Sequence, residues 1–493
     1  MRRSPLCGLL VLSCALAMAT ACNGSTDAGS IQILIGEQTD TFTQSPPVTQ
    51  IIVTADVGTD AGYSVTTLAT AAYPASTIDL GEQDEETVAT LQVAGEDANG
   101  LQLVYGQSLA VEYGALAGTT LPIFVQRVGQ NANLPNPLAD ARQSPTLSIL
   151  SGRFLIESGG PDSTLSSTTN VYDFAQFDEI SGPPTLPVAG ASMPIVGTIG
   201  LVISSSGAAY YDFSGATSTV TGVAPPTDGG AYSWADVAGG QSIYDSYDGL
   251  WFVVGATQTT GTPTQAVLEI NTNDLSNSSY LTGNLHWFSL SSPRLGASVA
   301  WLPTTDQLVV GGGSGTAAGI EVLQLTASGA SNGVPLSFPP DASVGSGMSW
   351  QGAATTLLMA GGVLPSGADA GVRILDTTCP TCPKDTWVSA FMCGSTPCPL
   401  TLCSAFSYSQ AQGFLVGSET STGTTPGLTH TFFLTNGAAT EIPTRVPHTN
   451  ASAIESPVGS VLIVGGNAEF ESFIPCPGGV CASGGPTDGG STD

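Results

Sequence analysis

The side chains best suited to chemistry in this chain are cysteines, which gather in short loops near its C-terminal end. Beyond residue 22 there are seven, namely Cys379, Cys382, Cys393, Cys398, Cys403, Cys476 and Cys481. Close spacing among prolines and glycines predicts local disulfides, and the candidates are Cys379, Cys382, Cys393, Cys398, Cys476 and Cys481. Because seven is odd, one thiol stays unpaired, and Cys403 is the expected one. The CxxC of Cys379 and Cys382 also fits half of a zinc site or a redox pair.

Three arginines stand at similar distances ahead of a recurring glycine. The distances are 17, 17 and 20 residues, from Arg142 to Gly159, from Arg294 to Gly311 and from Arg445 to Gly465. If repeated units begin at these arginines around a common axis, the guanidinium groups can converge and bind a carboxylate or a sugar acid. In the alternative interpretation, each arginine ties the start of a unit to backbone carbonyls of the neighbouring unit or to an acid.

Patterns typical of catalysis are scarce. The three histidines, His286, His430 and His448, are not spaced as a local metal motif, and no G-x-S-x-G, P-loop or H-E-x-x-H sequence occurs. We therefore predict no catalytic residue, no bound metal and no cofactor. Calcium is the one alternative, because acids cluster around Glu82 and Glu86, but no EF-hand loop is present.

The charge of the chain excludes some classes of partner. Its formal net charge is −30 at pH 7, and Lys384 is its only lysine. A surface of this sign repels the phosphate backbone, so nucleic-acid binding is excluded, and so is adhesion to anionic lipid through a basic patch.

The first residues have the composition of an export signal. Arg2 and Arg3 precede an apolar stretch, and small residues lead to Cys22. This order resembles a bacterial lipoprotein signal, which implies cleavage of residues 1–21, lipidation of Cys22 and a flexible tether over residues 22–30. An ordinary secretory cleavage after Ala21 is the alternative, since the usual leucine three residues before the cysteine is Ala19 here. We expect a chain anchored in the bacterial cell envelope, in the outer membrane, with contact to the membrane only through the lipid.

The elements that position the side chains discussed above come from a repeat. Seven short apolar runs each stop on a glycine, and the landmark glycines are Gly159, Gly207, Gly255, Gly311, Gly361, Gly417 and Gly465. Successive landmarks are 48, 48, 56, 50, 56 and 48 residues apart. That interval is typical of a four-stranded propeller blade, so the sequence predicts an all-β fold with a seven-bladed β-propeller.

The best unit carries a family resemblance. It consists of the runs GASVAWLP, QLVVGGG and GIEVLQL, and a glycine doublet of this kind recurs at residues 159–160, 361–362 and 465–466. This pattern resembles a Kelch repeat, or the central domain of galactose oxidase, although most units lack the repeat's tryptophan. The resemblance implies a propeller and leaves the chemistry open, because the architecture hosts unrelated functions.

The remaining boundaries follow from strand patterns. Residues 31–120 alternate apolar and polar residues between turn formers, which predicts a small β-sandwich, immunoglobulin-like in the loose sense. The propeller then spans residues 121–475, and residues 476–493 form a tail rich in Gly, Pro and Cys. The last unit lacks a fourth strand, so we expect residues 121–138 to complete the final blade and close the ring.

Together these features indicate a binding, adhesion or interaction module, and the protein or glycan partner is unknown. The alternative is a carbohydrate-active enzyme, of oxidase or hydrolase type, that uses the loop face of the propeller. Whether the chain is an enzyme stays open at this stage. Carboxylates, or a histidine with a tyrosine, converging on one site would favour the enzyme.

Overall fold

A computed structural model describes most of the chain from residue 25 onward. It covers residues 25–27, 29–59, 62–160, 168–180, 193–196, 198–212, 220–228, 232–245, 248–255, 262–272, 284–313, 319–326, 329–330, 334–335, 343–351, 355–378, 385–422, 425–435 and 437–476. Strands dominate these residues, and none of their helices is long and apolar enough to cross a membrane. Cys22 and residues 477–493 of the predicted tail lie outside the described residues. Part of the segment expected to be a flexible tether is a strand instead, because Ser25–Asp27 pairs antiparallel with Glu82–Asp84.

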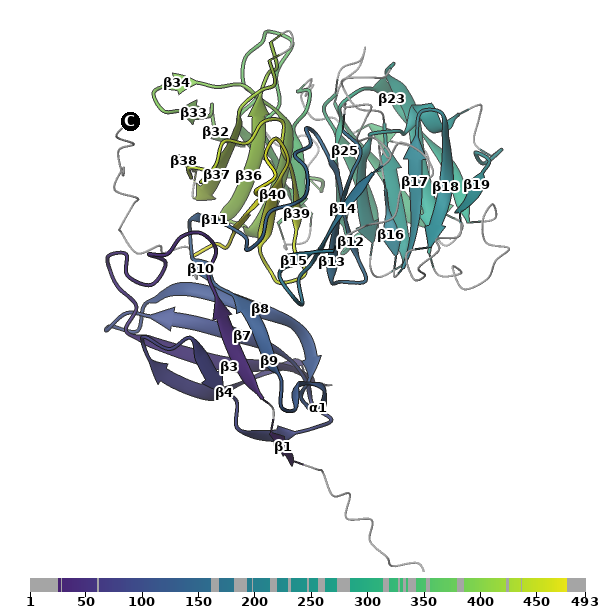
Figure 1. Ribbon diagram of the computed structural model, residues 1–493. Helices are drawn as coiled ribbons and strands as arrows, with labels where there is room; N and C mark the ends of the chain where they lie inside the picture. The colour runs from purple at the N-terminus through teal and green to yellow at the C-terminus, as the bar shows by residue number, and fades with distance from the viewer. Residues whose placement is uncertain are drawn as a thin grey trace, which may run out of the picture.

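The N-terminal part is a sandwich of two sheets, drawn in purple and blue in Figure 1. The larger sheet has the order β10-β8-β7-β3-β4, with β10 Gln126–Arg127, β8 Gln102–Glu112, β7 Val88–Glu96, β3 Gln50–Thr59 and β4 Gly62–Ala72. The smaller has the order β5-β2-β9, with β5 Thr77–Asp79, β2 Ser30–Leu34 and β9 Thr120–Phe124. A short ribbon of β1 Ser25–Asp27 and β6 Glu82–Asp84 and the helix α1 Tyr113–Leu116 lie beside them.

The sandwich core lies between the two sheets. Ile31 of β2, Ile123 of β9, Ile51 of β3 and Leu91 of β7 are fully buried in one cluster. Alternation of apolar and polar residues predicted this burial, and β7 shows it along its whole length. One pairing in the sandwich is parallel rather than antiparallel, namely that of β2 with β9. Two strands so far apart in sequence can pair parallel because β3 to β8 connect them.

Seven antiparallel sheets follow in the described part of the chain, each built around one of the apolar runs. The strands of each sheet are given from the inner strand outward. The first sheet consists of β12 Thr146–Leu150, β13 Phe154–Ser158, β14 Thr169–Asp173 and β15 Asp178–Glu179, and the second of β16 Ile195–Val196, β17 Ile199–Ser204, β18 Gly207–Asp212 and β19 Val220–Val223. The third consists of β20 Gln241–Asp245, β21 Leu250–Val254, β22 Thr264–Asn271 and β23 Leu285–Arg294. The fourth and fifth are β24 Ser298–Leu302, β25 Gln307–Gly311, β26 Ile320–Thr326, β27 Gly329–Ala330, with β28 Val334–Pro335 also on β26; and β29 Gly347–Trp350, β30 Thr356–Ala360, β31 Val372–Asp376, β32 Asp385–Val388. The sixth is β35 Leu400–Ser409, β36 Gln412–Glu419, β37 Thr429–Thr435, β38 Ala438–Glu441. The seventh is β39 Ser452–Glu455, β40 Val461–Val464, β41 Glu471–Phe473, β11 Asn131–Asn133.

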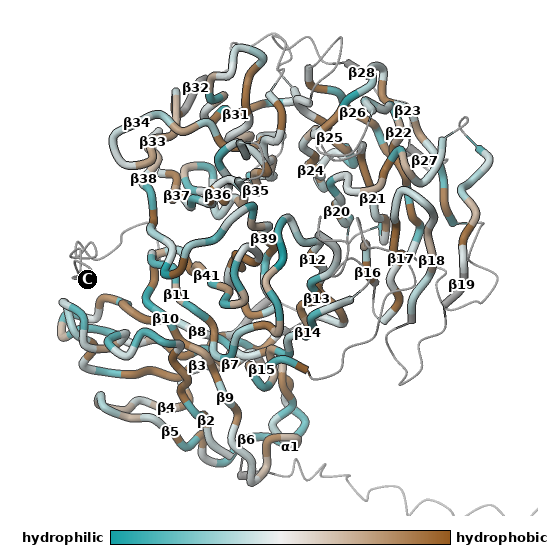
Figure 2. Tube along the Cα trace, turned by 45° about the horizontal axis from the view of Figure 1, so that its top comes forward, coloured by the Kyte–Doolittle hydropathy of each residue, from teal (hydrophilic) through white to brown (hydrophobic). Residues whose placement is uncertain are grey.

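These sheets stand around a common centre, as Figure 2 shows. A separate apolar cluster fills each space between neighbours: Ile156 of the first sheet meets Val202 of the second, and Phe414 of the sixth meets Phe473 of the seventh. The last cluster joins Leu462 of the seventh sheet to Leu155 of the first, so the packing returns to its start. Because the second strand of every sheet is buried on both sides, its sequence is a continuous apolar run rather than an alternating one. The predicted all-β fold with a β-propeller is confirmed.

The ring is closed by a strand from the N-terminal side. β11 pairs antiparallel with β41, placing Asn131 opposite Phe473. Residues 121–138 were expected to supply this strand, and they do. However, β9 and β10 belong to the sandwich sheets, because their backbone groups pair with β2 and β8. Hydrogen bonding therefore puts the start of the propeller after Arg127 rather than at residue 121.

Glycine after the second strand allows the incoming loop of the same sheet, or of a neighbouring one, to approach closely. Gly312 has a φ of 64°, and a Cβ there would lie 2.4 Å from the carbonyl oxygen of Ser343. Gly466 has a φ of 73°, and a Cβ there would meet the backbone of Thr449. The positive φ and the close approach of another backbone segment both exclude residues that carry a Cβ, which explains the glycine doublets in the sequence.

Candidate functional site

Two of the three arginines singled out in the sequence are buried against the sheet that follows them, although Arg294 is itself the last residue of β23 in the third sheet. Arg142 and Arg294 precede the inner strands β12 and β24, and they expose 2% and 1% of their surfaces. Each guanidinium reaches the glycine turn that follows the second strand. Arg142 Nη1 lies 3.5 Å from the carbonyl oxygen of Gly159, and Arg294 Nη1 lies 2.7 Å from that of Gly312. We call this arrangement of a buried basic side chain, a glycine turn and a buried glutamate a lead-in clasp.

In the fourth sheet the clasp contains a direct ion pair. Arg294 Nε and Nη2 donate to Oε1 of Glu321 at 3.1 and 2.6 Å, and both side chains are 1% exposed. The N–H of Ser291 and the hydroxyl of Ser292 donate to the same carboxylate. Burial by itself raises the pKa of Glu321, but the hydrogen bonds from Arg294 and Ser291 outweigh it and hold the pKa below its ordinary value.

In the first sheet the arginine has a different acid. Arg142 Nε donates to Oδ1 of Asp140 at 2.9 Å and lies 3.7 Å from Oε2 of Glu157, which accepts from Asn170 Nδ2 at 2.7 Å. Burial raises the pKa of Glu157 to about 8, and the contacts with Asn170 and Arg142 oppose this only in part. The two clasps therefore shift the pKa of their glutamates in opposite directions, because only Arg294 donates hydrogen bonds directly to its glutamate.

The seventh sheet uses His448 for the clasp rather than Arg445. His448 is fully buried; its Nδ1 lies 2.9 Å from the carbonyl oxygen of Gly465 and its Nε2 lies 3.2 Å from Oε1 of Glu471. It stands 17 residues before Gly465, the same distance as Arg142 and Arg294 from their glycines. This spacing is the sequence signal that identifies His448, and it is visible only when histidine is considered beside arginine.

Arg445 has a separate role at the closure of the ring. Its side chain is exposed at the start of the seventh sheet, where Nε donates to the carbonyl of Asn131 at 2.7 Å and Nη2 to Oε1 of Gln130 at 2.8 Å. It thereby holds the segment that carries β11 against the last unit. The structure does not bring the three predicted arginines together, since each belongs to a different part of the ring. Their contacts with carbonyls and acids resemble the second interpretation, but Arg142 and Arg294 contact carbonyls of the unit that they introduce rather than those of its neighbour.

The cysteines confirm part of the disulfide prediction. Cys393 and Cys398 form a disulfide with a Cα–Cα distance of 5.7 Å, and Cys476 is disulfide-bonded as well. Among the described cysteines Cys403 alone is free, as expected, and burial raises the pKa of its thiol to about 12. Cys379, Cys382 and Cys481 lie outside the described residues.

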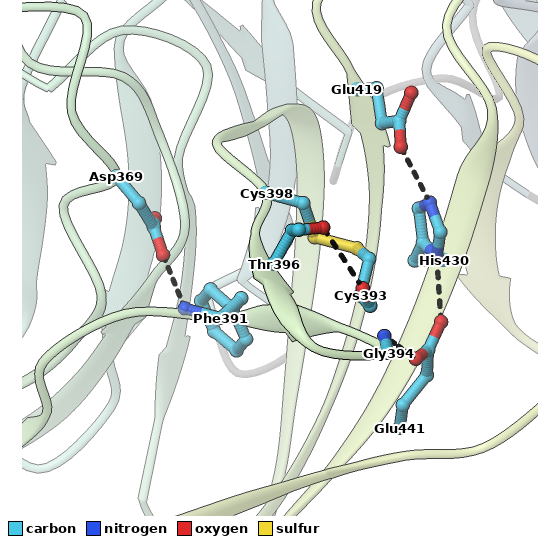
Figure 3. The surroundings of a disulfide bond; sticks show 9 residues. All are labelled: Asp369, Phe391, Cys393, Gly394, Thr396, Cys398, Glu419, His430 and Glu441. Atoms are coloured by element: carbon cyan, nitrogen blue, oxygen red, sulfur yellow. Dashed lines mark hydrogen bonds and ion pairs between the residues drawn. A yellow bond between two sulfur atoms is a disulfide. The ribbon is translucent and has the colours of Figure 1, made fainter.

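The Cys393–Cys398 disulfide braces a hairpin beside a histidine, as Figure 3 shows. The hairpin consists of β33 Met392–Cys393 and β34 Thr396–Pro397, in the connection between the fifth and sixth sheets. His430 of β37 faces it, with Nδ1 2.7 Å from Oε1 of Glu441 and Nε2 3.2 Å from Oε1 of Glu419. The N–H of Gly394 also donates to Oε2 of Glu441 at 3.1 Å, which ties the hairpin tip to the sixth sheet.

The base of the hairpin is fixed by apolar packing. Phe391 is fully buried, and its ring lies 4.8 Å from that of Phe432, centroid to centroid. Its N–H donates to Asp369, and its carbonyl accepts from the N–H of Cys398 at 3.1 Å. Burial raises the pKa of Asp369, and the N–H donors, Phe391 among them, oppose that rise. The buried ring of Phe391 at the base of the hairpin and the Cys393–Cys398 disulfide across it together restrict its motion.

Exposed and partly exposed side chains lie on this hairpin and on the sixth sheet beside it. Met392 and Leu428 are 43% and 41% exposed, and the side chains of Glu419 and Glu441 are 46% and 32% exposed. Leu428 joins the group because its carbonyl accepts from the N–H of Glu419 at 2.9 Å. We call the surface formed by Met392, Leu428, Glu419 and Glu441 the hairpin face.

Clusters able to hold a metal are rare in the described part of the chain. One group of three metal-ligating side chains occurs there, formed by Cys393, Cys398 and His430. His286 lies on the surface elsewhere, 2.6 Å from Asp228. The acids around Glu82, considered for calcium, form no such group among the described residues.

Comparisons with known proteins give distant similarities. No family model matches the chain, and no curated protein does. Among solved structures, a chain of the mitotic checkpoint complex is 12% identical with a TM-score of 0.43, and the match covers 70% of this chain and 95% of that one. The β-propeller domain of Cps50 (Swd1) from Myceliophteria thermophila is 10% identical with a TM-score of 0.40, covering 69% and 98%. A quinonprotein alcohol dehydrogenase-like protein from Bacteroides thetaiotaomicron is 12% identical with a TM-score of 0.37, covering 85% and 96%.

Proposed function

We propose that this chain is a lipid-anchored protein of the bacterial cell envelope whose Kelch-like propeller acts as a binding module. The observation that carries the proposal is the hairpin face, an exposed surface on a rigid support. Loops held by a rigid scaffold are the usual place for recognition. Fixing them before binding lowers the entropy lost when a partner docks.

The composition of the hairpin face sets the chemistry of its partner. Met392 and Leu428 offer flexible apolar contacts, while Glu419 and Glu441 offer carboxylates in a chain of net charge −30. A protein segment with both basic and apolar side chains complements this surface, and the field of the whole chain speeds its approach.

Peptide binding tests this function. The soluble chain that begins at residue 23 is applied to an array of peptides that differ in charge and apolar content. We expect peptides with Lys or Arg beside apolar residues to bind, and binding to weaken as salt is raised. The double substitution Met392→Asp and Leu428→Asp should reduce binding by more than tenfold.

Val65→Asp is the matched control, because Val65 is 61% exposed on β4 of the sandwich, remote from the hairpin face in the chain. Equal binding by the hairpin-face variant and by the control would show that the partner uses another surface. A glycan array run in parallel detects the other predicted class of partner. Glycan binding unaffected by the two aspartates would likewise move the site away from the hairpin face.

A further inference from the structure

The group formed by Cys393, Cys398 and His430 has the composition of a zinc site. The Sγ atoms and an imidazole nitrogen all lie within 4.8 Å of one another. Two thiolates and one imidazole are ligands that Zn²⁺ prefers, with Zn–S distances of about 2.3 Å. A tetrahedral centre therefore holds two sulfurs about 3.8 Å apart. Side-chain rotation at an unchanged Cα–Cα distance of 5.7 Å is enough to bring the sulfurs to that separation.

The surroundings of His430 supply the support that a metal-binding histidine needs. Both ring nitrogens face carboxylates, Nδ1 that of Glu441 and Nε2 that of Glu419. A histidine that binds a metal through one nitrogen usually donates the other N–H to a carboxylate, which fixes the ring. Whichever nitrogen binds the metal, the other keeps its partner.

We propose that reduction of the Cys393–Cys398 disulfide converts this hairpin into a zinc site with Cys393, Cys398 and His430 as ligands. A dithiol supplies two electrons and two protons. The S–S bond breaks, two cysteine thiols form, and the dithiol becomes a disulfide. Zn²⁺ then replaces the two thiol protons, which leave to solvent, and gains the imidazole nitrogen as its third ligand. Oxidised, the hairpin is closed by its own covalent bond; reduced, it is closed by the metal. The proposal does not depend on the identity of the partner bound by the hairpin face.

Cobalt titration tests this site. The soluble chain carrying Cys379→Ser and Cys382→Ser, which removes the competing CxxC, is reduced with dithiothreitol and freed of it without air. We expect one Co²⁺ per chain, with the absorption bands of thiolate-bound tetrahedral cobalt, and displacement of Co²⁺ by Zn²⁺. The oxidised protein should show no such bands.

Three variants in the same background assign the ligands. Cys393→Ser with Cys398→Ser should abolish the bands, and His430→Gln should weaken binding by at least about tenfold. His286→Gln, a change at the exposed histidine, should leave binding unchanged. The proposal is overturned if the reduced chain binds no cobalt or if the oxidised chain binds it equally. It is also overturned if the double cysteine variant or His430→Gln binds cobalt like the parent. Melting of the oxidised His430→Gln protein shows whether it is folded, so a loss of binding can be assigned to the ligand.

Discussion

Replacing Glu157 by glutamine should stabilise the protein in alkaline solution. The first sheet buries this carboxylate, with 1% of its surface exposed, and Arg142 bonds Asp140 instead. Its Oε2 accepts from Asn170, and its Oε1 has no hydrogen-bond partner among the described residues. Glutamine keeps an oxygen for Asn170 and carries no charge, so the substitution removes the cost of ionising a buried group.

The size and sign follow from the pKa. An unfolded glutamate ionises around 4.5, whereas burial raises the pKa of Glu157 to about 8. Between these values the folded chain holds one more proton than the unfolded chain, so stability falls as pH rises and levels off above about 8. The interval is about 3.5 pH units, and at about 1.4 kcal/mol for each unit the loss approaches roughly 5 kcal/mol by pH 8.5. The variant lacks this loss, so the two proteins should match near pH 4.5 and diverge above it.

Urea-unfolding midpoints, followed by tryptophan fluorescence from pH 5 to 9, provide the assay. The control is Glu321→Gln in the fourth sheet, where the ion pair with Arg294 depresses the glutamate pKa. A depressed pKa contributes stability that is present above about 4.5 and is lost only as pH falls through the folded value. The control should therefore be less stable than the parent by about 3 to 5 kcal/mol, with little change in that difference across the range.

The reasoning fails if the Glu157→Gln profile runs parallel to that of the parent from pH 5 to 9. It also fails if both glutamine variants are destabilised alike. Either result would mean that Glu157 is ionised in the folded protein at neutral pH and that Arg142 compensates its charge from 3.7 Å.

Three further predictions concern the anchor, the thiols and the closure of the ring. Mass spectrometry of the native N-terminus should find a lipidated Cys22, and a free residue 22 or another cleavage site would contradict this. Iodoacetamide should label about one thiol per chain, Cys403, and only after unfolding, because that thiol is buried and its pKa is raised to about 12; extensive labelling of the folded, unreduced chain would contradict it. A chain that begins at Asp140 lacks β11 and leaves β41 with an open edge, so it should aggregate or melt at a lower temperature than one that begins at Val128; equal melting would show that β11 is dispensable.

The repeat was legible in the sequence because a buried second strand must be apolar and must end on a glycine. The seven runs are the second strands of the seven described sheets, and residues such as Gly312 and Gly466 have no substitute where another loop comes so close. The disulfide of Cys393 with Cys398 and the free thiol of Cys403 followed from spacing and parity. These features are local, so a single segment contains the information that specifies them.

Only the tertiary structure decided which distant residues meet. The sequence put β9 and β10 with the propeller, but their backbone groups pair with β2 and β8, and strand pairing over such a distance leaves no local pattern. Arg142 and Arg294 have the same residue type and the same spacing, yet their glutamates differ in pKa direction. Burial prevails at Glu157, whereas hydrogen bonds from Arg294 and Ser291 outweigh burial at Glu321. His430 met its two carboxylates when β36, β37 and β38 paired, and it met the disulfide when the hairpin folded against the sixth sheet. Strand pairing, the glutamate pKa values and the surroundings of His430 all depend on distances of a few ångströms. Packing of the folded chain sets these distances, and the order of residues along the chain does not.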